Sequence, residues 1–260
     1  MRGEAGPAST GPKSKPKWDG FMSVTTRFTL YYWPIPFRGC FVSYLFAYRD
    51  HPLAMAGADD VAELRARPPG EQPVPFIGPP VLWDREANLY LSQMPAIVPY
   101  VARVLELFPK TPADEALAMK VLMDCNDVLM EICNYNGSKM WTPEAWRSFR
   151  GERLPRWMQI FESSLDRGFI GTDAPHYGDI GTFALFGTMT RCLPELAADL
   201  KAHAPGVFDL CERIGAQPSL KRFRDAEEAE FGQRYCGGQI EASIRAMLAA
   251  DGLGAAAERA

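Results

Sequence analysis

The stretch that decides the fold runs from Gln72 to Leu107 and reads QPVPFIGPPVLWDREANLYLSQMPAIVPYVARVLEL. The β-branched and aromatic residues of Val74–Ile77 and Val81–Trp83 predict two short strands. Pro95 stands at the favoured first position of the next helix, which we expect to reach Phe108. The stretch therefore predicts a pair of strands that leads directly into a helix.

The chain before this stretch supplies a further strand and two further helices. Residues 26–33 (TRFTLYYW) are aromatic and β-branched, as a strand requires. Apolar residues recur at helical spacing over 38–48, and a short helix is expected over 59–67. The order strand, helix, helix, strand, strand, helix predicts a thioredoxin-like α/β layer.

Beyond a linker at 108–114 (FPKTPAD) the pattern becomes entirely helical. The expected helices occupy 115–134, part of 141–166, 179–191, 194–203, 206–215 and 218–235. The predicted fold class is therefore an α/β domain followed by an all-α domain.

Five segments follow from these patterns. Residues 1–24 are a disordered lead-in, rich in Pro, Gly, Ser and Lys. The α/β domain occupies 25–107, the linker 108–114 and the helical domain 115–235. An Ala-rich tail, expected to be a surface helix or a frayed end, occupies 236–260.

Composition excludes several classes of protein. The 260 residues are 47% hydrophobic and carry a net charge of −4, with no basic cluster that would favour a nucleic-acid partner. No apolar run reaches the length of a membrane span, and the N-terminal stretch lacks the apolar core of a secretory signal. These features indicate a soluble, cytoplasmic protein without a membrane partner.

The cysteines and histidines indicate a reducing compartment and no metal site. There are six cysteines and three histidines, without a CxxC pair or the spacing of a zinc site. We expect buried free thiols and little material for histidine-based catalysis.

Two steps in the deciding stretch resemble the glutathione-binding half of the glutathione transferases. They are Val74-Pro75 before the strand pair and the Gln93–Ile97 step, QMPAI, that opens the helix. The resemblance implies a cis bond before Pro75, which leaves the backbone of Val74 free to pair with an extended peptide. It also implies helix amide groups that receive a carboxylate. The expected co-substrate is glutathione.

The second half of the chain carries the same resemblance. YGDIGTFALF, residues 177–186, is similar to the family's capped core helix, with Asp179 at the matching position and His176 where Ser or Thr is usual. PGVFDLCERIGAQPSLKRF, residues 205–223, is similar to a later helix. The resemblance covers roughly residues 26–225 and implies a homodimer.

The catalytic hydroxyl is expected at the end of the first strand. LYYWPIPFRG, residues 30–39, resembles the class in which a Tyr hydroxyl stabilises the glutathione thiolate, and Tyr32 takes that position. The gap to Arg38-Gly39 is two residues longer than usual. Tyr31, on the opposite face of the strand, is the alternative, and both tyrosines can instead be core aromatics.

The resemblance assigns the glutathione contacts as follows. Gln93 matches a Gln that binds the γ-glutamyl end, and Met94 replaces a Ser, so that only its backbone amide remains. Arg38 either reaches glutathione or forms a surface ion pair. Asp127 either meets the glutathione amine across a dimer or belongs to a solvated helix face.

The second substrate is expected between the domains. Residues that line its site, or belong to the core instead, are Phe37, Met130, Tyr135 and Trp141. Their apolar character favours a small apolar electrophile.

The resemblance implies conjugation of the glutathione thiolate to such electrophiles, a detoxification reaction, without a metal. Two alternatives stay open. One is a non-catalytic binding or scaffold protein of the same fold. The other is a glutathione-dependent thiol reductase using Cys40 beside Arg38, at the start of the first helix.

Overall fold

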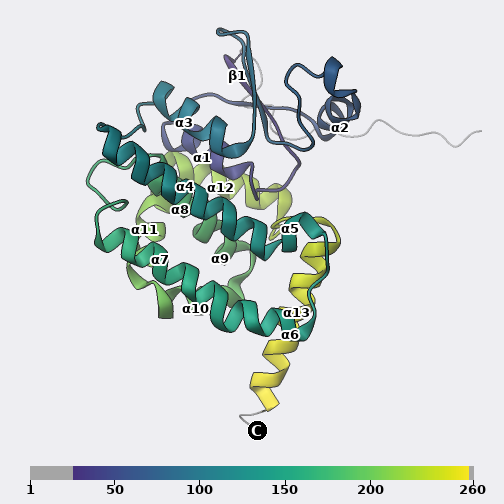
Figure 1. Ribbon diagram of the computed structural model, residues 1–260, viewed down its shortest axis with the longest axis vertical. Helices are drawn as coiled ribbons and strands as arrows, with labels where there is room; N and C mark the ends of the chain where they lie inside the picture. The colour runs from purple at the N-terminus through teal and green to yellow at the C-terminus, as the bar shows by residue number, and fades with distance from the viewer. Residues whose placement is uncertain (1–25, 258–260) are drawn as a thin grey trace, which may run out of the picture.

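The computed structural model describes residues 26–257, with side chains through Asp251, so the lead-in 1–24 lies outside the described residues. The N-terminal part holds a four-stranded sheet of order β2-β1-β3-β4 with helices packed beside it (Figure 1). β1 and β2 are parallel, and the other pairs are antiparallel. Its elements are β1 (Phe28–Tyr31), α1 (Cys40–Tyr48), β2 (Ala54–Met55), α2 (Ala58–Ala66), η2 (Pro69–Glu71), β3 (Val81–Asp84), β4 (Leu89–Ser92) and α3 (Met94–Val104).

The rest of the described chain is helical, as predicted. Helix α4, the longest among the described residues, forms the face nearest the viewer in Figure 1 together with α7. The elements are α4 (Pro112–Ile132), α5 (Asn134–Gly137), α6 (Pro143–Ser148), η3 (Phe149–Arg153), α7 (Leu154–Asp166), α8 (Tyr177–Thr182), η4 (Phe183–Gly187), α9 (Thr188–Cys192), η5 (Pro194–Leu196), α10 (Ala197–His203), α11 (Pro205–Gly215), α12 (Pro218–Phe231) and α13 (Gly238–Ala257). The predicted fold class is therefore confirmed.

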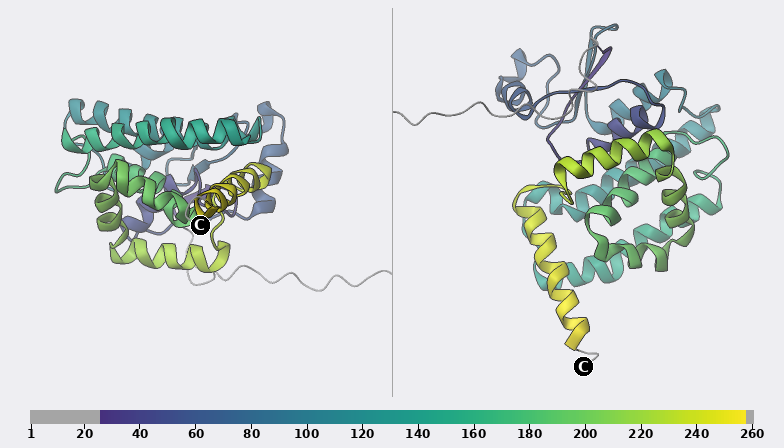
Figure 2. Two further views of the ribbon diagram at one scale, coloured as in Figure 1. Left: turned by 90° about the horizontal axis from the view of Figure 1, so that it is seen from below. Right: turned by 180° about the vertical axis from the view of Figure 1, so that it is seen from behind.

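Helix α1 lies at the centre of the molecule. Eight of its nine residues are buried, which matches its almost wholly apolar sequence CFVSYLFAY. It contacts α3 of its own domain and α8, η4 and α12 of the helical part. Figure 2 shows α12 running along the junction between the two parts of the chain. Elements of both domains therefore hold the start of α1 in place.

Of the two strands predicted over 74–77 and 81–83, the first was placed wrongly. Val74–Ile77 is irregular, and the pair is formed by β3 and β4. Pro73, Pro75 and Pro79 explain the error, because each lacks the N–H that a ladder requires. The apolar and aromatic run Leu89–Ser92 is the strand that was missed.

The N-terminus of α8 has both hydrogen bonds of a capping box, although its N-cap residue is a histidine. Asp179 is fully buried, and its carboxylate accepts the backbone N–H of His176 at 2.9 Å and that of Gly171 at 2.5 Å. His176 Nδ1 accepts the N–H of Gly178 at 3.0 Å. Histidine thus caps this helix at a position where a hydroxyl side chain is usual.

Asp84 closes the sheet at the end of β3. Its buried carboxylate accepts Arg27 Nε at 3.0 Å and Arg27 NH2 at 2.7 Å, and also the Tyr100 hydroxyl at 2.7 Å from α3. The N–H groups of Glu86 and Ala87 complete the set. Burial acts to raise the pKa of Asp84, but the hydrogen bonds from Arg27, Tyr100 and Ala87 outweigh it and lower the pKa to about 2.

Stability should fall in acid because of Asp84. Its folded pKa lies below its ordinary value of 3.8, so its contribution is present above that value and is lost as the pH falls. We expect Asp84→Asn to lower the free energy of unfolding by about 2 kcal/mol at neutral pH, and the difference to narrow below about pH 5. Urea denaturation across the pH range measures this. The control is Asp59→Asn, on an exposed face of α2; a constant difference for Asp84→Asn at every pH would contradict the assignment.

Candidate functional site

The ends of three strands meet at one edge of the sheet. The register pairs Tyr31 with Val81 and Val81 with Ser92. The loop after β1, the residues before β3 and the turn after β4 therefore lie side by side. This is where the sequence placed its catalytic and peptide-binding residues.

The cis proline at this edge is not the one expected. The cis bond lies between Pro79 and Pro80, directly before β3, and the prediction of a cis bond at Val74-Pro75 is wrong. Val74 and Pro75 lie outside the sheet, in a segment held by the Gln72 side chain. The backbone next to β3 is thus that of Pro79, which has a carbonyl to accept a hydrogen bond but no N–H to donate.

Tyr32 lies directly after β1 with its ring buried, 5% exposed. Its hydroxyl accepts the backbone N–H of Arg38 at 3.0 Å and has no acceptor for its own proton among the described residues. Burial raises the pKa of Tyr32 above its ordinary value, against the opposing charge of Arg38, so the hydroxyl stays protonated at neutral pH. Tyr31 is half-buried and belongs to the other face of the strand.

Arg38 carries a cation into this region from the other end of the loop. Its NH2 lies 3.0 Å from Met130 Sδ on α4, and its guanidinium lies 4.9 Å from the ring of Phe37. No carboxylate pairs with it within the described part of the chain. The two added loop residues fold inward, because Phe37 is buried with φ 23° and packs edge-on against Tyr235 at 5.3 Å.

The turn after β4 presents a side-chain amide and a backbone amide. Gln93 is exposed, has φ 71°, and its side chain makes no hydrogen bond to the described residues. Met94 is 1% exposed, so its side chain belongs to the core. Only its N–H, at the first position of α3, remains for a ligand, as the replacement of a Ser predicted.

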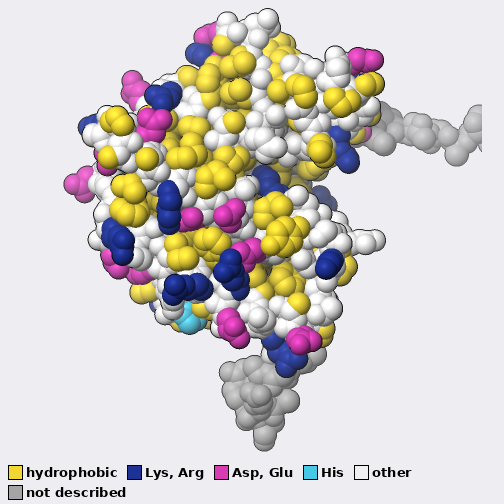
Figure 3. Space-filling view, viewed as in Figure 1, with side chains coloured by type: hydrophobic (Ala, Val, Ile, Leu, Met, Phe, Trp, Pro, Cys, Tyr) yellow, Lys and Arg dark blue, Asp and Glu magenta, His cyan; other side chains and the backbone are white. Residues whose placement is uncertain are grey.

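A pocket of about 490 Å³ lies between the loop after β1 and the start of α13. It is lined by Trp33, Ile35, Asn136, Gly137, Met140, Cys236, Gly237, Gly238, Gln239 and Ile240. Figure 3 shows the surface notched where the sheet domain meets the helical domain near α5. Its size and mixed lining suit a small organic molecule.

The four residues expected at the second substrate do not line this pocket. Phe37 is buried, Met130 contacts Arg38, and Tyr135 is 62% exposed. The indole N–H of Trp141 is bonded to the carbonyl of Ile132. Their chain neighbours, Asn136 and Met140, form the wall instead.

The sequence missed two parts of the lining. One comprises Trp33 and Ile35, in the loop whose extra length had only been noted. The other is residues 236–240, which had been assigned to a tail. The Gly237-Gly238 pair, both with positive φ, was the available signal, since it marks a sharp turn before a helix. Asp127 is exposed on α4, and nothing in the structure assigns it a ligand.

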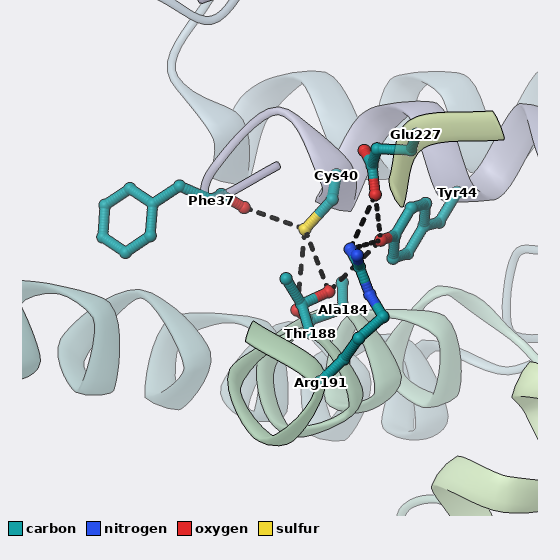
Figure 4. Close-up of polar contacts among 7 residues, drawn as sticks. All are labelled: Phe37, Cys40, Tyr44, Ala184, Thr188, Arg191 and Glu227. Carbon is teal, nitrogen blue, oxygen red and sulfur yellow. Dashed lines mark hydrogen bonds and ion pairs between the residues drawn. The ribbon is translucent and has the colours of Figure 1, made fainter. Parts of the chain in front are cut away.

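Cys40, at the start of α1, holds the end of the loop that follows β1 (Figure 4). Its thiol donates to the carbonyl of Phe37 at 2.8 Å, and the Thr188 hydroxyl lies 3.7 Å from the sulfur. The residue is 1% exposed, and burial, with the charge of Glu227, raises the pKa of this thiol well above its ordinary value. A buried, protonated thiol is a poor nucleophile, which disfavours the reductase alternative.

The same network joins α1 to the helical domain. The Tyr44 hydroxyl donates to Glu227 Oε2 at 2.8 Å, and Arg191 NH2 lies 2.8 Å from the same oxygen. Thr188 donates to the Tyr44 hydroxyl at 3.3 Å. These side chains come from α1, α9 and α12 and are all buried or nearly so. They fix α1 in place. The loop that carries Tyr32 leads into the start of this helix.

Comparison with known proteins gives a consistent answer. A family model described as the glutathione S-transferase C-terminal domain matches residues 117–247, half of the chain. The sequence matches no curated protein. The fold is similar to the Pi-class glutathione S-transferase of Onchocerca volvulus, with TM-score 0.66 and 16% identity over 82% of this chain and 99% of that one.

Two further solved structures are similar at the same level. The glutathione S-transferase of Ascaris lumbricoides gives TM-score 0.60 and 16% identity, over 77% of this chain and 97% of that one. Prostaglandin synthase D of Nilaparvata lugens gives TM-score 0.61 and 16% identity, over 76% and 97%. At these identities the likeness establishes the fold.

The contact between Tyr32 and the start of α1 requires a glycine at 39. A Cβ on Gly39 would press against Tyr32 Cδ1 and lie 2.7 and 2.8 Å from Cγ and Cε1. Gly39 has φ −65°, which alanine adopts freely, so the effect of Gly39→Ala is steric only. We expect a loss of about 1–3 kcal/mol in the free energy of unfolding. The control is Gly151→Ala, where a Cβ meets nothing within 4 Å; equal stability of both variants would show that the Tyr32 ring is placed elsewhere.

Proposed function

This chain belongs to the glutathione S-transferase family, and on that premise we propose that it conjugates the thiolate of glutathione to small apolar electrophiles. The observation that carries the proposal is the buried Tyr32 hydroxyl, whose proton has no acceptor in the described chain. It lies at the sheet edge where the peptide-binding elements meet. Glutathione is the co-substrate, and no step requires a metal.

Tyr32 acts on the thiol of glutathione. A free thiol has a pKa near ~8.5, so only a small fraction is thiolate at neutral pH. The hydroxyl keeps its own proton and donates it in a hydrogen bond to the sulfur anion, which lowers the pKa of the thiol. The cation of Arg38, without a carboxylate partner among the described residues, favours the same charged form. The thiolate then attacks an electrophilic carbon and displaces its leaving group.

The peptide is held by the turn after β4 and the residue before the cis bond. The Gln93 amide and the Met94 N–H face the γ-glutamyl end in this proposal, and the carbonyl of Pro79 takes the role first given to Val74 and Pro75. The electrophile occupies the pocket between Trp33 and α13. In this arrangement residues 25–107 bind glutathione, and the helical domain extends past 235 to include the start of α13.

A non-catalytic binding protein is the second candidate, and two observations favour it. Pro79 lacks the N–H and Met94 lacks the hydroxyl that would have bound the peptide. Each loss removes a hydrogen bond worth about 1 kcal/mol. Calorimetric titration with glutathione separates the two candidates when it is combined with an assay of conjugation.

We propose that the chain is a cytoplasmic homodimer that serves in detoxification. Ile77 is 92% exposed at the tip of the segment before β3, and Met123 on α4 is 41% exposed. Hydrophobic side chains gather on the upper part of the face in Figure 3, whereas charges of both signs alternate below. No described helix is both long and apolar enough to span a membrane.

Tyr32→Phe should lower kcat/KM for conjugation of 1-chloro-2,4-dinitrobenzene roughly ten- to hundredfold, because one donor to a developing charge is lost. KM for glutathione should change little, since the peptide contacts remain. The matched control is Tyr31→Phe, at the last residue of β1, which should retain activity. Equal turnover of Tyr32→Phe and wild type would remove Tyr32 from the mechanism.

Ile77→Asp should shift the protein towards monomer, because a charge in a dimer contact is costly to bury. Light scattering after size exclusion should give twice the 28.9 kDa chain mass for wild type. The control is Met140→Asp, another exposed apolar residue, 40% exposed, which lines the pocket. A wild-type mass of one chain at micromolar concentration would refute the dimer.

A further inference from the structure

The segment between α12 and α13 lies directly against the loop that follows β1. The ring of Tyr235 packs edge-on against that of Phe37, with the centroids 5.3 Å apart and the planes at 80°. Close by in the chain, a Cβ added at Gly237 would meet Ile35 Cδ1 at 3.5 Å. Phe37 and Ile35 both belong to the loop that begins with Tyr32. A segment distant in the sequence therefore contacts the loop of the proposed catalytic hydroxyl.

Phe37 needs support from its surroundings, because its backbone conformation is strained. Its φ of 23° is one that residues with a side chain rarely adopt. A residue persists in such a conformation only where the structure around it holds it there. The Phe37 ring is 5% exposed, and Tyr235, against which it packs, is 1% exposed. This buried packing opposes relaxation of the loop to an ordinary conformation.

The peptide unit between Phe37 and Arg38 connects this packing to the hydroxyl of Tyr32. Its carbonyl accepts the Cys40 thiol at 2.8 Å, and its N–H donates to the Tyr32 hydroxyl at 3.0 Å. A peptide unit is planar, so its two polar groups are oriented together. The N–H occupies one lone pair of the hydroxyl oxygen, which leaves the hydroxyl proton to be donated elsewhere. The conformation at Phe37 thus determines where the Tyr32 proton can point.

Tyr235 is in turn fixed by the first turns of α13. The Glu241 carboxylate accepts the backbone N–H of Tyr235 at 3.0 Å and that of Gly237 at 2.6 Å. Arg245 Nε donates to this carboxylate at 2.9 Å, and Arg245 NH2 donates to the carbonyl of Gln233 at 2.5 Å. The Tyr235 hydroxyl is fully buried and has no hydrogen-bond partner among the described residues. Backbone contacts and packing therefore hold this ring, and its hydroxyl does not.

We propose that Tyr235 is a positioning residue for the conjugation reaction. Its ring holds Phe37 in the conformation that directs the Arg38 N–H to the Tyr32 hydroxyl, and so keeps the hydroxyl proton available to the glutathione sulfur. Tyr235 acts through Phe37 and does not line the pocket for the electrophile. The inference rests on the proposed function, because it assigns a role in that reaction.

Replacement of Tyr235 by leucine and by phenylalanine tests the proposal in the full chain. Tyr235→Leu keeps an apolar side chain but removes the edge-on ring, whereas Tyr235→Phe keeps the ring and removes only the unpaired hydroxyl. In Tyr235→Leu we expect amide hydrogen exchange in the peptide 33–39, measured by mass spectrometry, to become roughly three- to tenfold faster. The pH profile of kcat/KM for 1-chloro-2,4-dinitrobenzene should shift to a higher apparent pKa, because the thiolate loses stabilisation. Tyr235→Phe should match wild type in both measurements.

The matched control is Phe161→Leu on α7, where the ring packs edge-on against Phe186 at 5.0 Å. It removes the same kind of buried aromatic contact, so it should lower stability and leave both the exchange of 33–39 and the pH profile unchanged. Thermal unfolding shows whether each variant is folded. Tyr235→Met takes the place of the leucine variant if that variant is unfolded, because methionine fills irregular space in a core.

Wild-type exchange or a wild-type pH profile in the folded leucine variant would overturn the proposal. The same changes in Tyr235→Phe or in Phe161→Leu would also overturn it, since neither variant removes the ring from Phe37. Absence of conjugation by the wild-type protein would count against the proposed function alone. The exchange of 33–39 would still report whether Tyr235 holds the Arg38 N–H in place.

Discussion

The buried contact set around Cys40 is the constraint on which the site depends. A loop of eight residues between β1 and α1 begins with Tyr32, and such a loop is free to move unless its end is held. The Cys40 thiol holds the carbonyl of Phe37, and the pair of Arg191 with Glu227 holds Tyr44 one turn further along α1. Breaking a buried ion pair costs about 3–5 kcal/mol, so this anchor is not easily released. The sheet domain is thereby fixed against the helices that complete the pocket.

This arrangement determines the reactivity of the Cys40 thiol. Its position at the start of a helix beside a cation suggested a reactive thiolate. Burial disfavours that alternative and agrees with the expected buried thiols, because a thiolate without solvent is costly and the thiol instead donates to a carbonyl. The polar side chains inside the junction thus serve the placement of Tyr32, whose hydroxyl is held by the backbone of Arg38.

The sequence predicted the fold well because periodicity and order are local properties. The strand of Tyr31, helix α1 and the run of helices after the linker were all visible in the spacing of apolar residues. The sequence placed the cis bond wrongly, since two Pro-containing steps lie five residues apart and only the pairing of Val81 decides between them. The pocket was also missed, because its far wall at 236–240 comes from the other end of the chain. Long-range placement of this kind leaves no pattern within a short window.

The central claim is that Tyr32 stabilises the thiolate of bound glutathione. The most direct measurement is an ultraviolet difference titration of thiolate absorbance in the glutathione complex, for wild type and Tyr32→Phe. The apparent pKa of the bound thiol should lie below the free value of about 8.5 in wild type and return towards that value in the variant. A bound thiol that titrates like the free one in wild type, or identically in both proteins, would contradict it.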